Sequence, residues 1–433
     1  MVLASLWLCF FSQSLQAERV LQQLLRGAGG DYLVEGVDGN FYGTDTSSSN
    51  LFQFRPDGTF HLLARLVGLN AELTLADDGN IYGTTRTGGA GYGTVFQIAP
   101  GGQVFPFYFF SSTFPGPTAL RKGLDGALYG VTGINSGSST IPPWIINQPT
   151  SIFQITTNGA FTTLHGGTNP PPGFNSSPVQ GRDGSLYGTA EFNIGSPSTR
   201  ASLIYKLSTG GAYQVLYRLT NGFISGGLIF GPDDSLYGTT GQYYPPRGAP
   251  ATGTVFRITT NGLFHELFAF SQTNGSDPQA RLLLASDSYL YGSTAQGGIS
   301  NSGTIFRITT NGNLTTLADL TYGNGPQAPL IEASDGNLYG TTSSGPGFPF
   351  GLGSIFRLVQ RPLITALDGA GGATTLTWTS FTNGIYRIDY KASLSIPAWT
   401  TLIPRVTATD STISITTNLP PAAQQYYRVT LLP

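Results

Sequence analysis

Five polar residues lie in a repeated sequence pattern, at positions where the residue type changes from one copy to another. Glu35, Lys122, Gln180 and Glu332 each lie three residues before a recurring aspartate, and Arg121 precedes Lys122. Two carboxylates roughly 5 to 10 Å apart can cleave glycosidic bonds. Glu35 and Glu332, with Arg121 or Lys122 as the nearby cation, are therefore the candidates for a hydrolase or lyase acting on carbohydrate. The alternative is that all five are polar residues at the wet mouth of a channel, without a catalytic role.

A second group of candidates consists of aromatic residues in long connecting segments rich in glycine and proline. Variable loops on a rigid scaffold often carry function. Such aromatic side chains can stack on sugar rings or anchor a partner protein, and the alternative is that they fold over one another in small local clusters. The six residues are Trp144, Phe174, Tyr243, Tyr244, Phe348 and Phe350.

Other reactive residue types argue against a catalytic or metal centre. His61, His165 and His265 fall in outer strands of different repeats, and Cys9 is the sole cysteine. We therefore expect no cofactor and no metal. An aspartate also stands four residues before a tyrosine that recurs in every repeat. A catalytic group is normally needed once, whereas a turn-forming residue is needed in every repeat, so these aspartates are predicted to form turns. These aspartates are Asp38, Asp78, Asp125, Asp183, Asp233, Asp287 and Asp335.

The elements that position these residues follow from an internal repeat. A Tyr-Gly pair recurs at intervals of 40 to 58 residues, and an aromatic residue in a strand-like run follows each pair after a variable segment. The tyrosines are Tyr42, Tyr82, Tyr129, Tyr187, Tyr237, Tyr291 and Tyr339, and the following aromatics are Phe52, Phe96, Phe153, Tyr205, Phe256, Phe306 and Phe356.

Each repeat is predicted to form four antiparallel strands. In the last repeats, residues 328–333 exemplify the first strand, 338–342 the second and 304–308 the third. Asp-Gly and Asn-Gly turns join the first strand to the second and the third to the fourth, because glycine adopts positive φ freely. A small residue two before each aspartate predicts a crowded axis. An apolar residue five before it predicts packing between neighbouring repeats.

The two ends of the repeat array complement each other. The seventh repeat stops after its third strand, 355–358, and residues 19–25 carry the spacing of a fourth strand. The N-terminal strand then completes the last repeat, and closure removes exposed sheet edges. The sequence therefore predicts an all-β chain in which residues 18–360 form a closed seven-bladed β-propeller.

The pattern Asp78-Gly79…Tyr82-Gly83-Thr84-Thr85…Gly93-Thr94-Val95-Phe96 resembles the Gloeo/Verruco tandem repeat of secreted bacterial proteins. The resemblance covers roughly residues 19 to 359. It implies export and a repeat architecture. It carries over no catalytic residues, because the family pattern defines none.

Residues 361–433 break the repeat and alternate with a period of two in several short runs, which predicts a small β-sandwich. The module distantly resembles fibronectin type III modules that end secreted bacterial proteins. Trp378 and Trp399 are predicted to be core residues rather than ligand platforms.

The start of the chain is predicted to be a signal peptide of residues 1–17, since residues 2–11 are apolar but too short to span a bilayer. No longer apolar run suggests a membrane span, and we expect a monomer in the extracytoplasmic space or at the cell surface. The formal net charge of −2 argues against nucleic-acid binding.

Three functions remain open from the sequence. The favoured one is an exported, non-catalytic protein that binds a polysaccharide or a cell-surface protein through the loop-rich face. The second is the carbohydrate-active enzyme outlined above. The third is a structural component of the cell envelope or matrix.

Overall fold

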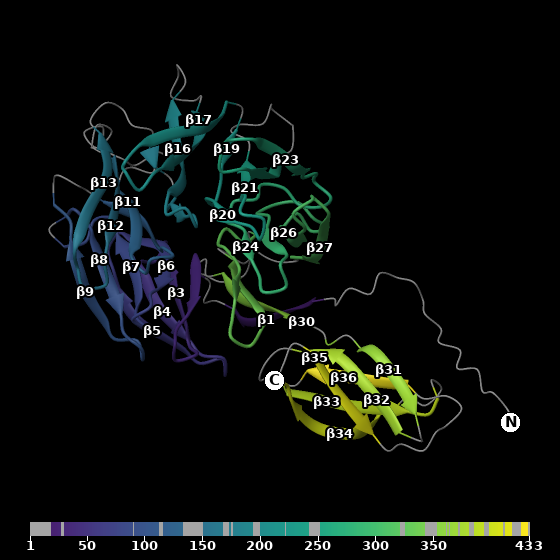
Figure 1. Cartoon of the computed structure of the whole chain (residues 1–433). Coiled ribbons are helices and arrows are strands. Elements are labelled where there is room, and N and C mark those ends of the chain that lie inside the picture. The colour runs from purple at the N-terminus through teal and green to yellow at the C-terminus, as the bar shows by residue number, and fades with distance from the viewer. Residues whose placement is uncertain are drawn as a thin grey trace. The chain divides into compact units, whose positions relative to one another are not determined.

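The structure is a computed structural model. It describes residues 19–26, 30–89, 91–111, 116–132, 150–167, 173–174, 176–193, 200–220, 222–241, 252–320, 325–342, 353–360, 362, 364–370, 373–380, 385–393, 398–409, 412–417 and 426–431. All regular elements in these residues are β-strands (Figure 1). The chain divides into two compact units: residues 21–334 and 338–357 make up the first, and residues 358–433 the main part of the second.

The strands of residues 19–360 that the structure describes form seven antiparallel sheets, here numbered in chain order. Sheet 1 contains β2 (Tyr32–Glu35), β3 (Phe41–Asp45), β4 (Asn50–Phe54) and β5 (Phe60–Arg65). Sheet 2 contains β6 (Leu69–Leu75), β7 (Ile81–Thr85), β8 (Thr94–Ile98) and β9 (Val104–Phe109). Sheet 3 contains β10 (Pro117–Lys122), β11 (Leu128–Thr132), β12 (Thr150–Ile155) and β13 (Phe161–Gly167).

In sheets 4 and 5 the first strand is split into two short pieces that pair with the same second strand. Sheet 4 contains β14 (Gly173–Phe174), β15 (Val179–Gln180), β16 (Leu186–Asn193), β17 (Arg200–Leu207) and β18 (Tyr213–Leu219). Sheet 5 contains β19 (Phe223–Ile224), β20 (Ile229–Phe230), β21 (Leu236–Gly241), β22 (Gly253–Ile258) and β23 (Phe264–Ala269).

In the last two sheets the strands predicted at 304–308 and 338–342 are observed, whereas the first strand predicted at 328–333 is shorter and spans Ile331–Glu332. Sheet 6 contains β24 (Leu283–Leu284), β25 (Leu290–Ser293), β26 (Thr304–Ile308) and β27 (Leu314–Asp319). Sheet 7 contains β28 (Ile331–Glu332), β29 (Leu338–Thr342) and β30 (Ser354–Gln360), and β1 (Arg19–Arg26) pairs with β30 as its fourth strand. The predicted pairing of the N-terminal strand with the last repeat is therefore confirmed.

The Tyr-Gly pair has a structural explanation in every sheet. The tyrosine hydroxyl of the second strand donates to the aspartate four residues earlier, as in Tyr82 to Asp78 at 2.8 Å and Tyr129 to Asp125 at 2.6 Å. The glycine leaves room for the aromatic ring of the third strand. A Cβ on Gly292 would lie 2.5 Å from the ring of Phe306, closer than real Cβ contacts occur. The strongest columns of the repeat are thus packing and turn requirements.

The small residue before each Asp-Gly turn was predicted to mark a crowded axis, and the structure gives a different reason. A Cβ on Gly36 would lie 2.7 Å from Oδ1 of Asp38 and 2.8 Å from the ring of Tyr42. Gly36 is therefore covered by the aspartate–tyrosine pair of its own repeat, whereas at Gly123 the side chain of Gln180 from the next sheet also lies 2.7 Å away. Three repeats accommodate alanine at this position.

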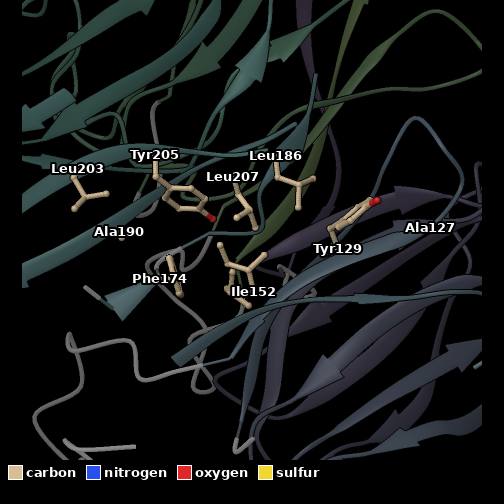
Figure 2. Close-up of a cluster of buried hydrophobic side chains, with 10 residues drawn as sticks. Ala127, Tyr129, Ile152, Phe174, Leu186, Ala190, Leu203, Tyr205 and Leu207 are labelled. Carbon is tan, nitrogen blue, oxygen red and sulfur yellow. The ribbon is translucent and has the colours of Figure 1, made fainter. Parts of the chain in front are cut away.

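Neighbouring sheets share hydrophobic clusters. Figure 2 shows the cluster that Tyr129 and Ile152 of sheet 3 form with Leu186 and Tyr205 of sheet 4. Similar clusters join sheets 1 and 2, 2 and 3, 4 and 5, and 5 and 6. Another joins sheet 1 to sheet 7, and Leu24 of β1 packs against it. The predicted packing of the apolar first-strand column between neighbouring repeats is confirmed.

The second unit contains two three-stranded antiparallel sheets. One consists of β31 (Ile364–Ala370), β32 (Ala373–Thr379) and β35 (Thr412–Thr417), and the other of β33 (Ile385–Lys391), β34 (Thr400–Thr407) and β36 (Tyr426–Leu431). Both contribute to one core, in which Trp378 is fully buried as predicted. Trp399 does not reach this core: it is half-buried, with Lys391 and Arg428 over its ring.

Candidate functional site

The two glutamates proposed as a catalytic pair connect neighbouring sheets. Both carboxylate oxygens of Glu35 in sheet 1 accept hydrogen bonds from Ser334 of sheet 7, from its backbone at 2.6 Å and its hydroxyl at 2.5 Å. Glu332 accepts the same two bonds from Ser286 of sheet 6, at 2.7 and 2.6 Å. Both carboxylate oxygens of each glutamate thus accept hydrogen bonds from a serine in the neighbouring turn. This geometry favours a structural role over acid–base catalysis.

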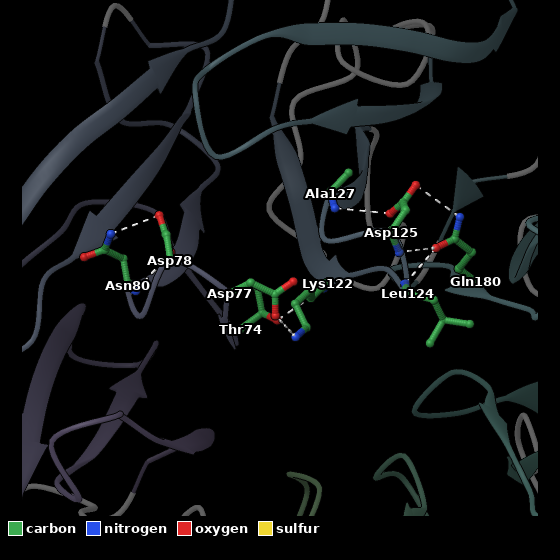
Figure 3. Close-up of polar contacts among 9 residues, drawn as sticks. All are labelled: Thr74, Asp77, Asp78, Asn80, Lys122, Leu124, Asp125, Ala127 and Gln180. Atoms are coloured by element: carbon green, nitrogen blue, oxygen red, sulfur yellow. Dashed lines mark hydrogen bonds and ion pairs between the residues drawn. The ribbon is translucent and has the colours of Figure 1, made fainter.

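Gln180 and Lys122 make equivalent connections (Figure 3). Oε1 of Gln180 accepts hydrogen bonds from the backbone of Leu124 at 2.7 Å and of Asp125 at 3.2 Å, in the preceding turn. Nζ of Lys122 lies 2.5 Å from Oδ1 of Asp77 in the turn before it. The four polar residues of this column therefore each tie a sheet to the turn of its predecessor.

The prediction that Phe174 is an exposed aromatic on the loop-rich face is wrong. Its side chain is 1% exposed and belongs to the core cluster of sheets 3 and 4. Its ring meets Tyr205 edge-on, with ring centres 5.4 Å apart. Phe174 lies in β14, which pairs with β16, so its side chain packs in the core between two sheets. Trp144, Tyr243, Tyr244, Phe348 and Phe350 lie outside the described residues.

The turn aspartates are held by hydrogen bonds of their own repeat. Although partial burial opposes the change, hydrogen bonds from Lys206, from the Ser185 backbone and from Tyr187 lower the pKa of Asp183 to about 2. The pKa values of Asp38, Asp78, Asp125 and Asp233 are lowered in the same sense by comparable hydrogen bonds. Their geometry and electrostatics agree with the predicted structural role.

The described residues hold no group of three or more histidine, cysteine or acidic side chains that fits a metal ion. His165 stacks on Tyr213 with ring centres 4.5 Å apart, and burial lowers its pKa. His61 and His265 are exposed on other sheets. In the same part of the chain, no helix is long and apolar enough to cross a bilayer.

A cavity of about 410 Å³ opens among the first strands and Asp-Gly turns of sheets 3 to 7, and we call it the central cavity. Most of its wall is apolar, and its charged residues are three arginines and one aspartate. The lining residues are Arg121, Leu124, Val179, Gln180, Arg182, Ile229, Phe230, Gly231, Pro232, Asp234, Arg281, Leu282, Leu283, Leu284, Pro329 and Leu330.

Arg121 projects from β10 into this wall. One guanidinium nitrogen donates to the backbone carbonyl of Leu228 in sheet 5, at 2.8 Å. Burial, and next the repulsion of the Arg281 cation, lower the pKa of Arg121 to about 9. Among the described residues, no carboxylate lies within ion-pair distance of Arg121. The fold therefore holds a cation here at an electrostatic cost.

Arg281 pairs with a carboxylate contributed from sheet 2. Its guanidinium forms an ion pair with Glu72, whose side chain is 9% exposed and also accepts a hydrogen bond of 2.7 Å from Ser177. Although burial opposes the change, Glu72 raises the pKa of Arg281. Burial, and next the same carboxylate, raise the pKa of Tyr32, which therefore stays a neutral phenol. Arg281 lines the central cavity, whereas Glu72 does not.

Sequence reasoning missed the Glu72–Arg281 ion pair beside the cavity, although a usable signal was present. Arg121 lies four residues before its turn aspartate, and Glu72 and Arg281 lie six before theirs. Side chains alternate between the two faces of a strand. Positions four and six lie on one face of the strand and positions three and five on the other, and both faces contribute to the wall: Gln180 at position three and Leu282 at position five line the cavity as Arg121 does at position four. Of the sequence candidates, the structure brings Arg121 and Gln180 to the cavity wall.

Part of this chain matches a known family of repeat proteins. The family model described as the Gloeobacter/Verrucomicrobia repeat matches residues 174–386. The repeats within these residues belong to that family. The match begins in sheet 4 and continues beyond β30 through β31 and β32 to the start of β33. Sheets 1 to 3 lie outside the match but carry the same Asp, Tyr-Gly and aromatic columns. A comparison with curated proteins finds no match.

Solved structures similar to this repeat protein are propeller-like. A streptogramin B lyase has a TM-score of 0.54 at 16% identity, with 79% of this chain and 98% of the lyase covered. A catalytically inactive virginiamycin B lyase from Staphylococcus aureus with quinupristin has a TM-score of 0.53 at 17% identity, with 79% and 99% covered. Hydrazine synthase of Kuenenia stuttgartiensis has a TM-score of 0.51 at 16% identity, with 72% and 92% covered. These likenesses establish an all-β, propeller-like fold.

Proposed function

We propose that this protein is an exported, non-catalytic binding protein that takes a small organic molecule in its central cavity. The observation that carries this proposal is the cavity itself: about 410 Å³, lined from five sheets. Small-molecule sites typically measure roughly 300 to 1,000 Å³ and combine apolar walls with a few placed polar groups. The central cavity meets both criteria.

The composition of the wall supports binding over catalysis. Among the described residues, the acidic side chain that lines the cavity is Asp234, and it lies 3.2 Å from Arg182. Neither histidine nor cysteine is among these lining residues. Glu35 and Glu332 are engaged by serines of the neighbouring turns. An acid–base pair is thus lacking at this site, and the carbohydrate-active alternative is not favoured.

We further propose that the seven sheets are the blades of one closed propeller, with β1 completing the last blade, and that residues 361–433 form a separate β-sandwich. Shared cores between successive sheets, and between sheets 1 and 7, support a closed array. Export through residues 1–17 is tested by expressing the full chain in a secreting bacterium and sequencing the N-terminus of the released protein. A start at Glu18 is expected, and retention of Met1 in the cytoplasm would contradict export.

Binding is tested with a variant that fills the cavity. Leu283→Trp places an indole on the wall, and Leu263→Trp is the matched control because Leu263 is 58% exposed and does not line the cavity. Fluorescence of the neutral dye Nile red is titrated with each protein. We expect saturable binding by the parent and by Leu263→Trp, and at least a tenfold loss in Leu283→Trp. Equal binding by all three proteins would refute a site in the central cavity.

A further inference from the structure

We infer that the central cavity selects a small carboxylate monoanion with an apolar body, and that Arg121 is the residue that binds its carboxylate. This inference rests on the proposed binding function and gives that site a ligand class. It follows from the charges at the cavity floor, from the donors of Arg121 and from the apolar residues that surround them.

The charged groups at the cavity wall and directly behind it carry more positive than negative charge. Arg121 and Arg281 are both cationic residues of the wall, and Glu72 is the carboxylate that pairs with Arg281. The three groups together carry one net positive charge. At the rim, Arg182 and Asp234 lie 3.2 Å apart, are 79% and 58% exposed, and cancel each other. A partly buried cation without a counter-ion is unfavourable, so a bound monoanion would stabilise the site.

The donors of Arg121 are largely available to a ligand. A guanidinium has five N–H donors in a planar fork, and the structure gives this one a hydrogen bond to the carbonyl of Leu228. That bond fixes the direction of the side chain across the cavity. The remaining donors suit a carboxylate, which arginine binds through two parallel hydrogen bonds. Arg281, held by Glu72, adds positive potential without giving up its own partner.

The rest of the wall defines the body of the ligand. Val179, Ile229 and Leu283 occupy the repeat position of Arg121, and Pro329 occupies that of Arg281, in sheets 4 to 7. These side chains present hydrocarbon to the cavity and offer no side-chain hydrogen bonds. A ligand that carries its carboxylate at one end and an alkyl or aryl group at the other satisfies both parts of the wall. A dianion such as a phosphate monoester would overcompensate the single net charge.

The inference is tested by calorimetric titration of the full mature chain with octanoate, 1-octanol and octyl phosphate. These probes share one alkyl chain and differ in head group. We expect octanoate to bind at least tenfold more tightly than 1-octanol, and more tightly than octyl phosphate. Shortening octanoate by one methylene should weaken binding about fourfold, the loss expected for a buried CH₂.

Three variants separate the role of Arg121 from a general effect on the fold. Arg121→Met should weaken octanoate about 10- to 100-fold, as expected for loss of a charged hydrogen bond, and leave 1-octanol within about twofold. Arg121→Lys keeps the charge without the fork and should give an intermediate loss. The matched control is Arg65→Met, at an exposed position of β5, and it should change nothing. Circular-dichroism melting verifies that each variant is folded.

A fourth variant tests the charge balance itself. Glu72→Gln leaves two net positive charges, so the preference should move from octanoate toward octyl phosphate. If the parent binds octanoate and 1-octanol equally and Arg121→Met changes neither, the inferred ligand class is wrong while a binding cavity remains. If none of the three probes binds and Nile red does not either, the proposed function fails together with the inference.

Discussion

The ring of Asp-Gly turns and the central cavity lie close together but follow opposite rules. In the turns, each aspartate accepts hydrogen bonds from its own repeat, and the arrangement recurs from sheet to sheet. At the cavity wall and directly behind it, Arg121, Glu72 and Arg281 occupy positions at which the other repeats carry uncharged residues. The residues that recur in every repeat form the fold, and the charged residues found in single repeats form the cavity site. Substitutions in the two regions should therefore affect different properties.

The largest effect is expected from the recurring aromatic core. Phe306 is fully buried between sheets 5 and 6. Phe306→Ala should lower the free energy of unfolding by about 3 to 5 kcal/mol, because the cavity that it leaves adds to the lost transfer free energy. Phe105→Ala is the matched control, since Phe105 is 49% exposed. Urea denaturation measures both, and similar losses in the two variants would contradict the assigned role of the column.

The glycine of the Tyr-Gly pair should give the next largest effect. Gly292→Ala places a methyl group 2.5 Å from the ring of Phe306 and 2.7 Å from Leu282. Overpacking of this kind costs about 1 to 3 kcal/mol. Gly210→Ala is the control, since its nearest neighbouring atom would be 3.9 Å away. A thermal melt that shows no difference between the two variants would remove the packing explanation for the Tyr-Gly motif.

The aspartate–tyrosine hydrogen bond should contribute less, and in a pH-dependent way. Tyr82→Phe should cost about 1 kcal/mol at neutral pH. The folded pKa of Asp78 is lowered, so its stabilisation is complete above the unfolded value near 4 and is lost as the pH falls through the folded value. Denaturation at pH 7 and at pH 2 should therefore show the difference between parent and variant shrinking in acid. A constant difference would argue against an ionised acceptor.

The smallest effect on stability is expected in the central cavity. Arg121→Met removes a cation that the fold holds at a cost, while it gives up one hydrogen bond to Leu228. These effects oppose each other, so the free energy of unfolding should stay within about 1 kcal/mol of the parent. Chemical denaturation checks this value. A loss of stability as large as that of Phe306→Ala would show that Arg121 is needed for the fold. It would argue against a binding role for this residue.

The sequence predicted the strands well because their columns recur. The strands at 304–308 and 338–342, the role of residues 19–25 and the burial of Trp378 were all readable from spacing. The site was predicted poorly because nothing recurs there. The column at Glu35, Lys122, Gln180 and Glu332 was chosen for its polarity, although strand alternation places it on the face shared with neighbouring sheets. Phe174 was assigned to a loop, whereas it lies in β14, and the pairing of β14 with β16 places it in the core.

The sequence by itself determined the repeat, its turns and the pairing of residues 19–25 with the last repeat. Each of these depends on the spacing of residues within a single strand or turn. Only the tertiary structure decided which polar residues meet. Glu72 and Arg281 are separated by 209 residues, and Arg121 and Leu228 by 107. No local rule connects positions so far apart. Their meeting depends on how sheets far apart in the sequence pack together, and that packing leaves one positive charge in excess at the cavity wall.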